Sequence, residues 1–182
     1  MKRIDTPLEG LYVLEPKVFG DARGFFMESF NARTFEALLG FAPQFVQDNH
    51  SRSQRGVLRG LHYQIRQPQA KLVRVTRGAV WDVAVDLRRS SLTFGQCFAC
   101  ELSEENQRQM WIPAGFAHGF LVLSEVADFL YKTTDFYAPE HERCLQWNDP
   151  ALGLAWPLGE LVPKLSAKDL QGAPLASCEL FD

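Results

Sequence analysis

The sequence predicts a mainly β protein, built as an antiparallel sandwich or barrel with a few short helices. Short runs rich in β-branched and aromatic residues recur about every ten residues, separated by Gly, Pro and Asn. Helical periodicity is nearly absent, so a doubly wound α/β fold would lack its helices. The 182 residues, 46% of them apolar and 12% aromatic, suffice for one domain with a substantial core.

The expected strands are Leu11–Pro16, Phe25–Phe30, Gln44–Ser51, Gly56–Gln64, Lys71–Thr76, Ala79–Leu87, Phe94–Leu102, Gln109–Ile112, His118–Leu123 and Ala127–Thr133. Between the first two, the glycines and aspartate of 19–24 indicate a turn. In 79–87, acidic residues interrupt valines at a spacing that no helix face explains. One helix is expected over Ala32–Leu39, because Asn31 can cap its start and Gly40 can end it.

We expect a single domain over residues 1–182, with no internal repeat, low-complexity segment or linker. From about residue 148 onward, Asp149-Pro150, Trp156-Pro157 and Pro163 indicate irregular chain. This tail is expected to wrap over the barrel, with one short capped turn at Ser166.

Charge, termini and cysteines exclude several classes of protein. The net charge of −3 does not indicate a nucleic-acid-binding surface, although a small anionic ligand needs only local positive charge. The N-terminus lacks the apolar core of a signal peptide and no apolar run could span a bilayer, so we expect a cytoplasmic protein that binds no membrane. Cys97 and Cys100 fall on opposite faces of a strand with no second CxxC, which favours reduced, structural thiols.

The stretch Gly56–Gln64 contains the first candidate functional residue. In a regular strand, one face carries Leu58, Gly60, His62 and Gln64, and the other carries Arg59, Leu61 and Tyr63. His62 therefore lies on a face with mostly apolar neighbours. This stretch alone favours neither interpretation of His62: it could be a core histidine whose ring nitrogens bind backbone groups, or a functional histidine.

A second histidine, His118, follows Pro113-x-Gly115 and begins a strand. The two histidine elements together resemble the paired motifs of cupins, which are small jelly-roll barrels. Metal-binding cupins place two histidines one residue apart, then a glutamate, and a third histidine later. Here Gln64 stands at the second position and no glutamate follows among residues 65–69. Two imidazoles and an amide make a poor divalent-metal site, so we predict no metal and expect both histidines to be free for acid–base work.

A closer resemblance covers residues from about 4 to 170. The motifs in 19–29, 45–51, 58–64, 111–120, 129–132 and 165–169 resemble those of the dTDP-4-dehydrorhamnose 3,5-epimerases, in the family's order. The resemblance implies a cupin-type jelly-roll homodimer without metal or cofactor. It also implies that the substrate is a dTDP-linked keto-sugar, which is epimerised at two carbons on the way to dTDP-L-rhamnose.

Epimerisation next to a ketone requires a base, a partner for the enolate oxygen, and an acid on the far face. The resemblance assigns these roles to His62, Lys71 and Tyr131 respectively, with Asp169 orienting His62. Each has a plainer interpretation: Asp169 as a helix cap, Lys71 as a solvated strand lysine, Tyr131 as a packing residue. Ala70 stands where the family usually has glycine, so a need for positive φ there would strain the chain and shift Lys71.

The remaining residues that match family positions would hold the substrate. The resemblance assigns to binding Arg23, Phe26, Glu28, Gln47, Asp48, Asn49, Arg59, His118, Tyr137, Glu142 and Lys168. Guanidinium groups suit diphosphate oxygens, aromatic rings offer flat surfaces to a base, and amides and carboxylates suit sugar and base edges. Core packing or turn hydrogen bonds would explain the same residue types without a ligand.

Two questions stay open at this level. A regular strand places Arg59 and His62 on opposite faces, so either an irregularity at Gly60 re-aims the chain or Arg59 serves a ligand bound by the other subunit. A relative inverting only one carbon, or a silent nucleotide-sugar-binding module, would share much of the sequence. A silent module should have lost His62, Lys71 or Asp169, and none is lost.

Overall fold

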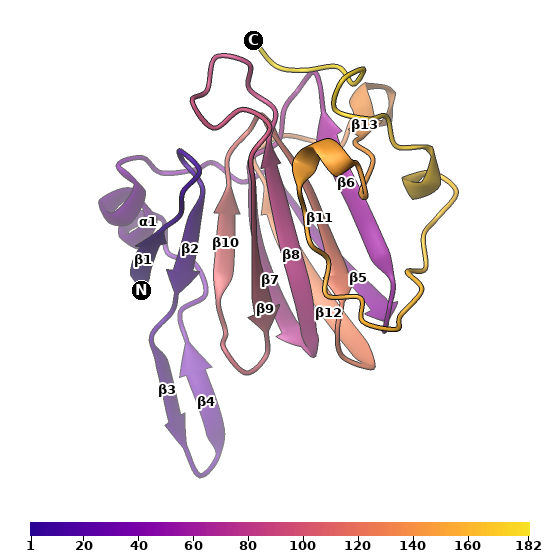
Figure 1. Ribbon diagram of the computed structural model, residues 1–182. Coiled ribbons are helices and arrows are strands. Elements are labelled where there is room, and N and C mark those ends of the chain that lie inside the picture. Colours follow the sequence, from indigo (N-terminus) through magenta and orange to yellow (C-terminus); the bar gives the residue numbers. More distant parts are fainter.

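The computed structural model describes residues 1–182 and consists of two antiparallel sheets packed face to face, with a protruding hairpin (Figure 1). The first sheet has the order β1 (Lys2–Asp5), β2 (Tyr12–Glu15), β10 (Gln109–Ile112), β7 (Lys71–Arg77), β12 (Val126–Thr133), β5 (Gln47–Gln54). The second has the order β13 (Glu142–Cys144), β6 (Leu58–Gln64), β11 (Phe116–Val122), β8 (Ala79–Asp86), β9 (Cys97–Ser103). The predicted mainly β, antiparallel class is confirmed.

The main core lies between the two sheets, where alternate residues of each strand point inward. Val73 of β7 and Ala84 of β8 belong to this cluster and are fully buried. Phe120 of β11 and Phe129 of β12 join the two sheets, since their rings stack with centroids 4.2 Å apart. This core fixes the separation of β6 and β11 from β7 and β12, and all four strands contribute to the site described below.

The outer face of the six-stranded sheet carries the one α-helix, α1 (Ala32–Leu39), at the predicted bounds. The Asn31 side chain accepts hydrogen bonds from the backbone N–H groups of the first turn, and Gly40 ends the helix at φ 83°. Phe35 anchors the helix in a small cluster with Leu14 and Trp111. At eight residues, this helix is far too short to cross a bilayer, and no longer one exists.

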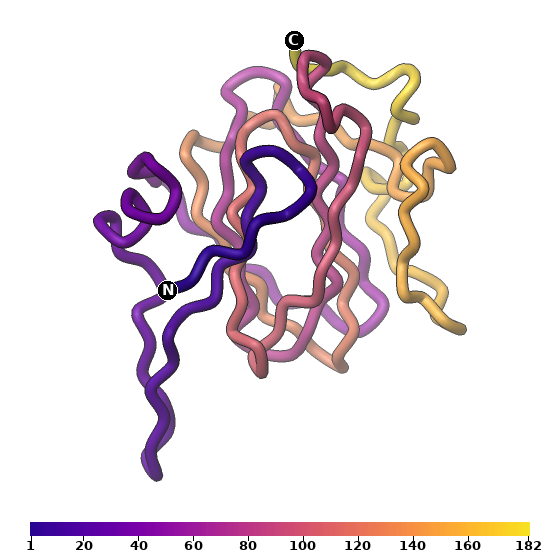
Figure 2. The backbone as a smooth tube through the Cα atoms, turned by 60° about the vertical axis from the view of Figure 1, so that its left-hand side comes forward, coloured from indigo at the N-terminus to yellow at the C-terminus, as the bar shows by residue number.

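The chain after residue 148 lies against the outer face of the five-stranded sheet (Figure 2). It contains two short 3-10 helices, η2 (Pro150–Leu152) and η3 (Asp169–Gln171), while η1 (Pro139–His141) precedes β13. Lys164 exchanges backbone hydrogen bonds with Gly56 and Leu58, at 2.8 and 3.0 Å. The expected wrapping tail is therefore a bonded part of the fold, and it brings residue 169 beneath β6.

Several strand boundaries differ from those predicted. β5 begins at Gln47 and runs to Gln54, because it pairs with β12 along its whole length despite its polar sequence. β1 and β13 were not predicted, since neither short run has a clear alternating pattern and each forms only by pairing with one neighbour. The expected turn over 19–24 contains the end of β3 (Val18–Asp21), whose partner is β4 (Gly24–Met27).

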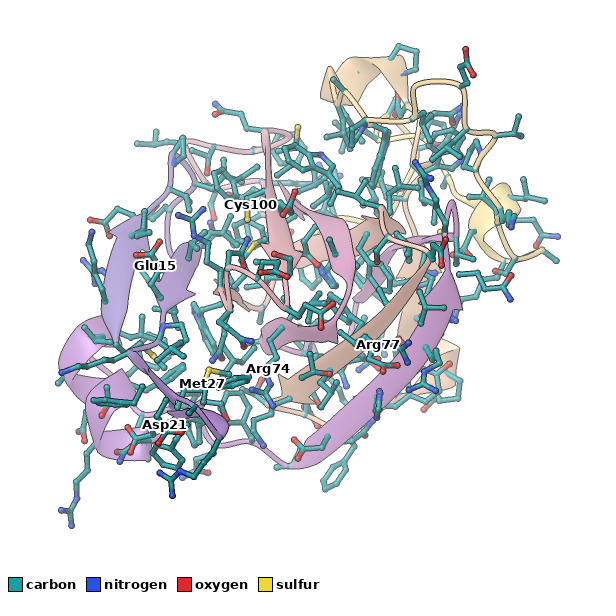
Figure 3. All side chains as sticks on the ribbon, turned by 90° about the horizontal axis from the view of Figure 1, so that it is seen from below. Glu15, Asp21, Met27, Arg74, Arg77 and Cys100 are labelled. Carbon is teal, nitrogen blue, oxygen red and sulfur yellow. The ribbon has the colours of Figure 1, made fainter.

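The β3–β4 hairpin, called the arm below, projects away from both sheets (Figures 1 and 2). Phe19, Phe25 and Phe26 on it are more than half exposed. At its base, Met27 lies beside Arg74 of β7, seen from below in Figure 3. An isolated two-stranded hairpin is only marginally stable. The exposed aromatic side chains of the arm pack against little of their own chain, and such apolar patches are typical of a surface that contacts another molecule.

Candidate active site

A cavity of about 290 Å³ opens between the two sheets and collects most of the residues singled out from the sequence. It is lined by Asn49, His50, Ser51, Arg59, His62, Tyr63, Gln64, Gln69, Lys71, His118, Gly119, Phe120, Phe129, Tyr131, Tyr137 and Glu142. The floor is apolar, formed by the stacked Phe120 and Phe129, whereas the walls carry ionisable groups. Such a mixed lining suits a ligand that needs both orientation and acid–base chemistry.

His62 of β6 and the tail residue Asp169 form a close pair at one side of the cavity. His62 Nε2 lies 2.7 Å from Asp169 Oδ1, and the carboxylate is almost completely buried. The contact is at ion-pair distance, although Nε2 has no well-directed hydrogen bond. A carboxylate beside Nε2 favours the proton on that nitrogen and leaves Nδ1 unprotonated, which is the form in which imidazole acts as a base.

Asp169 also makes the capping contacts with Ser166 that the sequence suggested as its alternative role, across the turn that leads into η3. Its Oδ2 accepts hydrogen bonds from the Ser166 N–H at 3.2 Å and from the Ser166 hydroxyl at 2.6 Å, while Ser166 Oγ accepts the Asp169 N–H. Its Oδ1 accepts the Gly60 N–H at 3.1 Å. Burial alone would raise the pKa of Asp169, but the contacts with His62, Ser166 and Gly60 hold this pKa well below its usual range. One carboxylate thus serves both as cap and as partner of His62.

Lys71 begins β7 and extends its ammonium group to the cavity wall. No carboxylate lies within 4 Å of its Nζ. Burial lowers the pKa of Lys71 to about 8, although Glu142 and Asp82 act in the opposite direction. The preceding Ala70 has no positive φ and exchanges hydrogen bonds with Thr134, so the strain considered at this position does not occur.

Tyr131 of β12 lies across the cavity, opposite Asn49 of β5 in the strand register. Burial raises the pKa of its hydroxyl, the charge of Glu142 raises it further, and Arg59 counteracts both. Tyr131 is consequently protonated at neutral pH and able to donate a proton.

An irregularity at Gly60 brings Arg59 and His62 into the same cavity. The pairing of β6 with β11 shifts register between His118 and Phe120, and Gly60 adopts φ 110°. A side chain at Gly60 would collide with Gly119 Cα and His118 O, each 2.6 Å from the Cβ position. The regular alternation expected for this strand is therefore wrong, and the alternative of a glycine-assisted kink explains how both side chains line one site.

A second buried His–Asp pair was missed by the sequence reasoning. His118 Nε2 lies 3.0 and 3.1 Å from the two carboxylate oxygens of Asp82 on the neighbouring strand β8. Burial lowers the pKa of His118 and raises the pKa of Asp82, while their mutual attraction opposes both shifts. A signal existed, because Asp82 shares a strand face with the core residues Val80 and Ala84.

The cavity mouth carries a linked polar group. Tyr137 donates a hydrogen bond to Glu142 at 2.7 Å, Lys168 forms an ion pair with the same carboxylate, and Gln47 accepts the Tyr137 N–H. The hydrogen bond to Glu142 raises the pKa of Tyr137 to about 12. Gln47 also donates to Asn49, so these predicted binding residues form one connected rim.

Four predicted binding residues lie away from both the cavity and its rim. Arg23 and Phe26 are on the arm, and Glu28, which follows it, accepts a hydrogen bond from Asn31. Asp48 is exposed and pairs with Lys132, beside a neighbouring hollow that Asn49 and Tyr131 also line. Within one chain, these residues do not join His62, and their role in binding stays a prediction.

Gln64 stands at the position of a metal-ligating histidine in cupins, and both its amide nitrogen and its amide oxygen form hydrogen bonds with backbone groups. Its Nε2 donates to the carbonyls of Gln67 and Phe136, and its Oε1 accepts the Ala138 N–H. The side chain therefore orders the loop before η1 instead of offering a ligand atom. His62 and His118 are each directed to a carboxylate, which suits them to proton transfer.

Comparison with known proteins gives concordant matches. A family model described as dTDP-4-dehydrorhamnose 3,5-epimerase matches residues 5–177. The dTDP-4-dehydrorhamnose 3,5-epimerase of Pseudomonas aeruginosa is 64% identical over 181 residues, covering 100% of this chain and 99% of that protein.

Two solved structures share the fold. The dTDP-6-deoxy-D-glucose-3,5-epimerase of Legionella pneumophila, in complex with dTDP-4-keto-L-rhamnose, superposes with a TM-score of 0.95 at 56% identity, covering 98% of this chain and 94% of that one. A 3′-monoepimerase from Streptomyces bikiniensis, in complex with dTDP-quinovose, gives a TM-score of 0.89 at 36% identity, covering 94% of this chain and 87% of that one.

Proposed function

Because this chain belongs to the dTDP-4-dehydrorhamnose 3,5-epimerase family, we propose that the cavity around His62 inverts carbons three and five of dTDP-4-dehydro-6-deoxy-D-glucose, which gives dTDP-4-dehydro-L-rhamnose. The protein is an epimerase of dTDP-L-rhamnose biosynthesis with a cupin-type jelly-roll fold. The observation that carries the proposed mechanism is the convergence of His62, Lys71 and Tyr131 on one cavity.

Four residues take part in the proton transfers of the proposed epimerisation. His62 removes the proton from the carbon next to the ketone, and Asp169 stabilises the imidazolium that forms. The Lys71 ammonium stabilises the negative charge that develops on the enolate oxygen. Tyr131 returns a proton to the opposite face of the same carbon, which inverts it. The ketone lies between the two carbons, so the same groups serve the second inversion once exchange with solvent has removed the proton from His62 and returned one to Tyr131.

The rim holds the nucleotide part of the substrate. Arg59 donates from Nε to Ser53 at 3.0 Å, and its terminal amino groups have no partner within the chain. These groups suit the diphosphate oxygens. Tyr137 presents an exposed ring next to Gln47 and Asn49, an arrangement that suits stacking of a base and hydrogen bonding to its edges.

The active form is a homodimer in which each arm completes the partner's site. Phe26 is 70% exposed and Phe25 is 61% exposed on a hairpin that contacts little of its own chain. Exposed aromatic residues on a projecting hairpin are typical of a protein interface. A second copy would bring Arg23, Phe26 and Glu28 to a cavity that lacks them, which accounts for all three family positions at once.

The four cysteines are free thiols, which supports a location in the reducing cytoplasm. None of them forms part of a disulfide framework, and three lie in strands.

Deuterium incorporation from heavy water into dTDP-4-dehydro-6-deoxy-D-glucose tests the proposed reaction. Label at carbons three and five, unchanged by a chelator, is the expected result. Label at one carbon would point instead to a single-carbon epimerase, for which the similarity to the 3′-monoepimerase is the supporting observation. Absence of exchange in the wild-type protein would rule out both.

A further inference from the structure

Cys144 lies next to the His62–Asp169 pair, although no role has been assigned to it. One ligand atom from each of His62, Cys144 and Asp169 lies within 4.8 Å of the others. Such a cluster of three nitrogen, sulfur and oxygen ligands occurs nowhere else in this chain.

The strand pairing explains why the three side chains meet. β13 lies beside β6 (Figure 1), and Cys144 is directly opposite His62 in the register of this pair. The neighbouring residues Leu61 and Leu145 exchange both backbone hydrogen bonds, so His62 and Cys144 form the non-hydrogen-bonded pair that follows. Side chains of such a pair lie on the same face and approach most closely. The cap at Ser166 then holds the Asp169 carboxylate against both.

The ligand atoms are available for a further partner. His62 Nε2 is buried without a well-directed hydrogen bond. The Cys144 thiol makes only a long contact of 3.6 Å to the Leu145 carbonyl and forms no disulfide. Asp169 Oδ1 faces His62 and is already close to Nε2.

We propose that His62, Cys144 and Asp169 form an inhibitory binding site for Zn²⁺. An imidazole, a thiolate and a carboxylate suit zinc better than magnesium or calcium, which prefer oxygen ligands. Tetrahedral zinc with bonds of about 2.0–2.3 Å holds its donors about 3.3–3.6 Å apart, so the His62–Asp169 contact has to widen by less than about 1 Å. Binding releases the thiol proton to solvent, and a water molecule fills the fourth position.

Zinc at this site stops catalysis through charge and geometry. The ion takes the place of the proton on Nε2 and neutralises Asp169. The imidazole then lies beside a divalent cation, so Nδ1 becomes a much weaker base. The inhibition rests on the proposed role of His62, whereas the binding of zinc does not.

Zinc binding is measured directly by titrating metal-free protein with Zn²⁺ in competition with a chromogenic chelator. The wild-type protein should bind one ion per chain. Cys144→Ser should weaken binding by at least about tenfold, since even the loss of a residue that only hydrogen-bonds to a metal ligand lowers affinity by that much. Cys97→Ser is the matched control, because the Cys97 thiol also donates to a backbone carbonyl, that of Leu152, but has no histidine beside it. Co²⁺ in place of zinc should give a thiolate-to-metal charge-transfer band in the wild type and in Cys97→Ser only.

Equal zinc affinity in the wild type and Cys144→Ser, or a cobalt spectrum without the thiolate band, would overturn the site and indicate adventitious binding at exposed histidines. In the epimerisation assay, zinc should inhibit the wild type, EDTA should restore the rate, and Cys144→Ser should resist inhibition. Stoichiometric zinc binding without loss of rate would refute the inhibitory role. If zinc-free protein shows no epimerisation, the proposed function fails while the titration still decides the zinc site.

Discussion

Replacing Asp169 by Asn tests its two roles, because the change removes the charge and keeps the shape. In the wild type, each carboxylate oxygen accepts a backbone N–H: Oδ1 accepts that of Gly60 at 3.1 Å and Oδ2 that of Ser166 at 3.2 Å. An amide has only one oxygen, so its NH₂ group must face one of these donors in either orientation. The substitution therefore affects both the cap and the partner of His62.

The expected loss of stability follows from the donor left without an acceptor. A buried unsatisfied N–H costs about 1–3 kcal/mol. The folded-state pKa of Asp169 is depressed, so its charge stabilises the fold above the unfolded pKa of about 3.9 and that contribution is lost as the pH falls through the folded-state value. The difference in unfolding free energy between the wild type and Asp169→Asn should accordingly shrink on acidification.

Asp169→Asn should lower the rate of deuterium exchange by far more than its modest loss of folding stability could explain. Without the carboxylate, the imidazolium loses its stabilising charge and the proton on Nε2 is no longer favoured, an effect that lowers kcat by about 10⁴-fold in a comparable triad. We expect a drop of about 10³–10⁴-fold in deuterium exchange, measured on protein that is shown to be folded by circular dichroism.

Asp149→Asn is the matched control. Asp149 is also buried, and its two carboxylate oxygens accept the N–H groups of Ala151 and Leu175 at 2.9 and 2.7 Å, but none of these residues lines the cavity. This variant should lose similar stability and keep its exchange rate. If Asp169→Asn keeps an exchange rate within a few-fold of Asp149→Asn, Asp169 is only a cap and its pairing with His62 has no part in catalysis.

Three further outcomes are expected. The pKa of Lys71 is about 8, so its cationic form is lost as the pH rises through that value and kcat/KM should fall there. Lys71→Arg should remove this alkaline decline, because a guanidinium group stays charged. Gly60→Ala should lower the melting temperature far more than Gly153→Ala, since both have positive φ but only the Gly60 side chain would collide with backbone atoms; equal melting temperatures would contradict this. Phe26→Ser should leave the secondary structure unchanged while converting the proposed dimer to a monomer in analytical ultracentrifugation, and a dimer of unchanged affinity would exclude the arm as the interface.

Much of the fold could be predicted from local signals. The α1 helix has the predicted bounds because its capping asparagine and terminal glycine act within a few residues. The long inner strands, such as β8, were found because burial on one face imposes alternation on the sequence. β13 could not be found this way, since three residues carry no period and their conformation depends on pairing with β6.

The antiparallel β class, the family and the groups needed for enolisation could be predicted from the sequence, because they depend on residue types and on patterns within single segments. Which of these groups meet depends on the three-dimensional fold. Gly60 binds Asp169 across 109 positions of chain, and Asp82 and Cys144 reach the histidines from separate strands. Such contacts depend on strand register, and a single shift of register at Gly60 moves a side chain from one face of the sheet to the other.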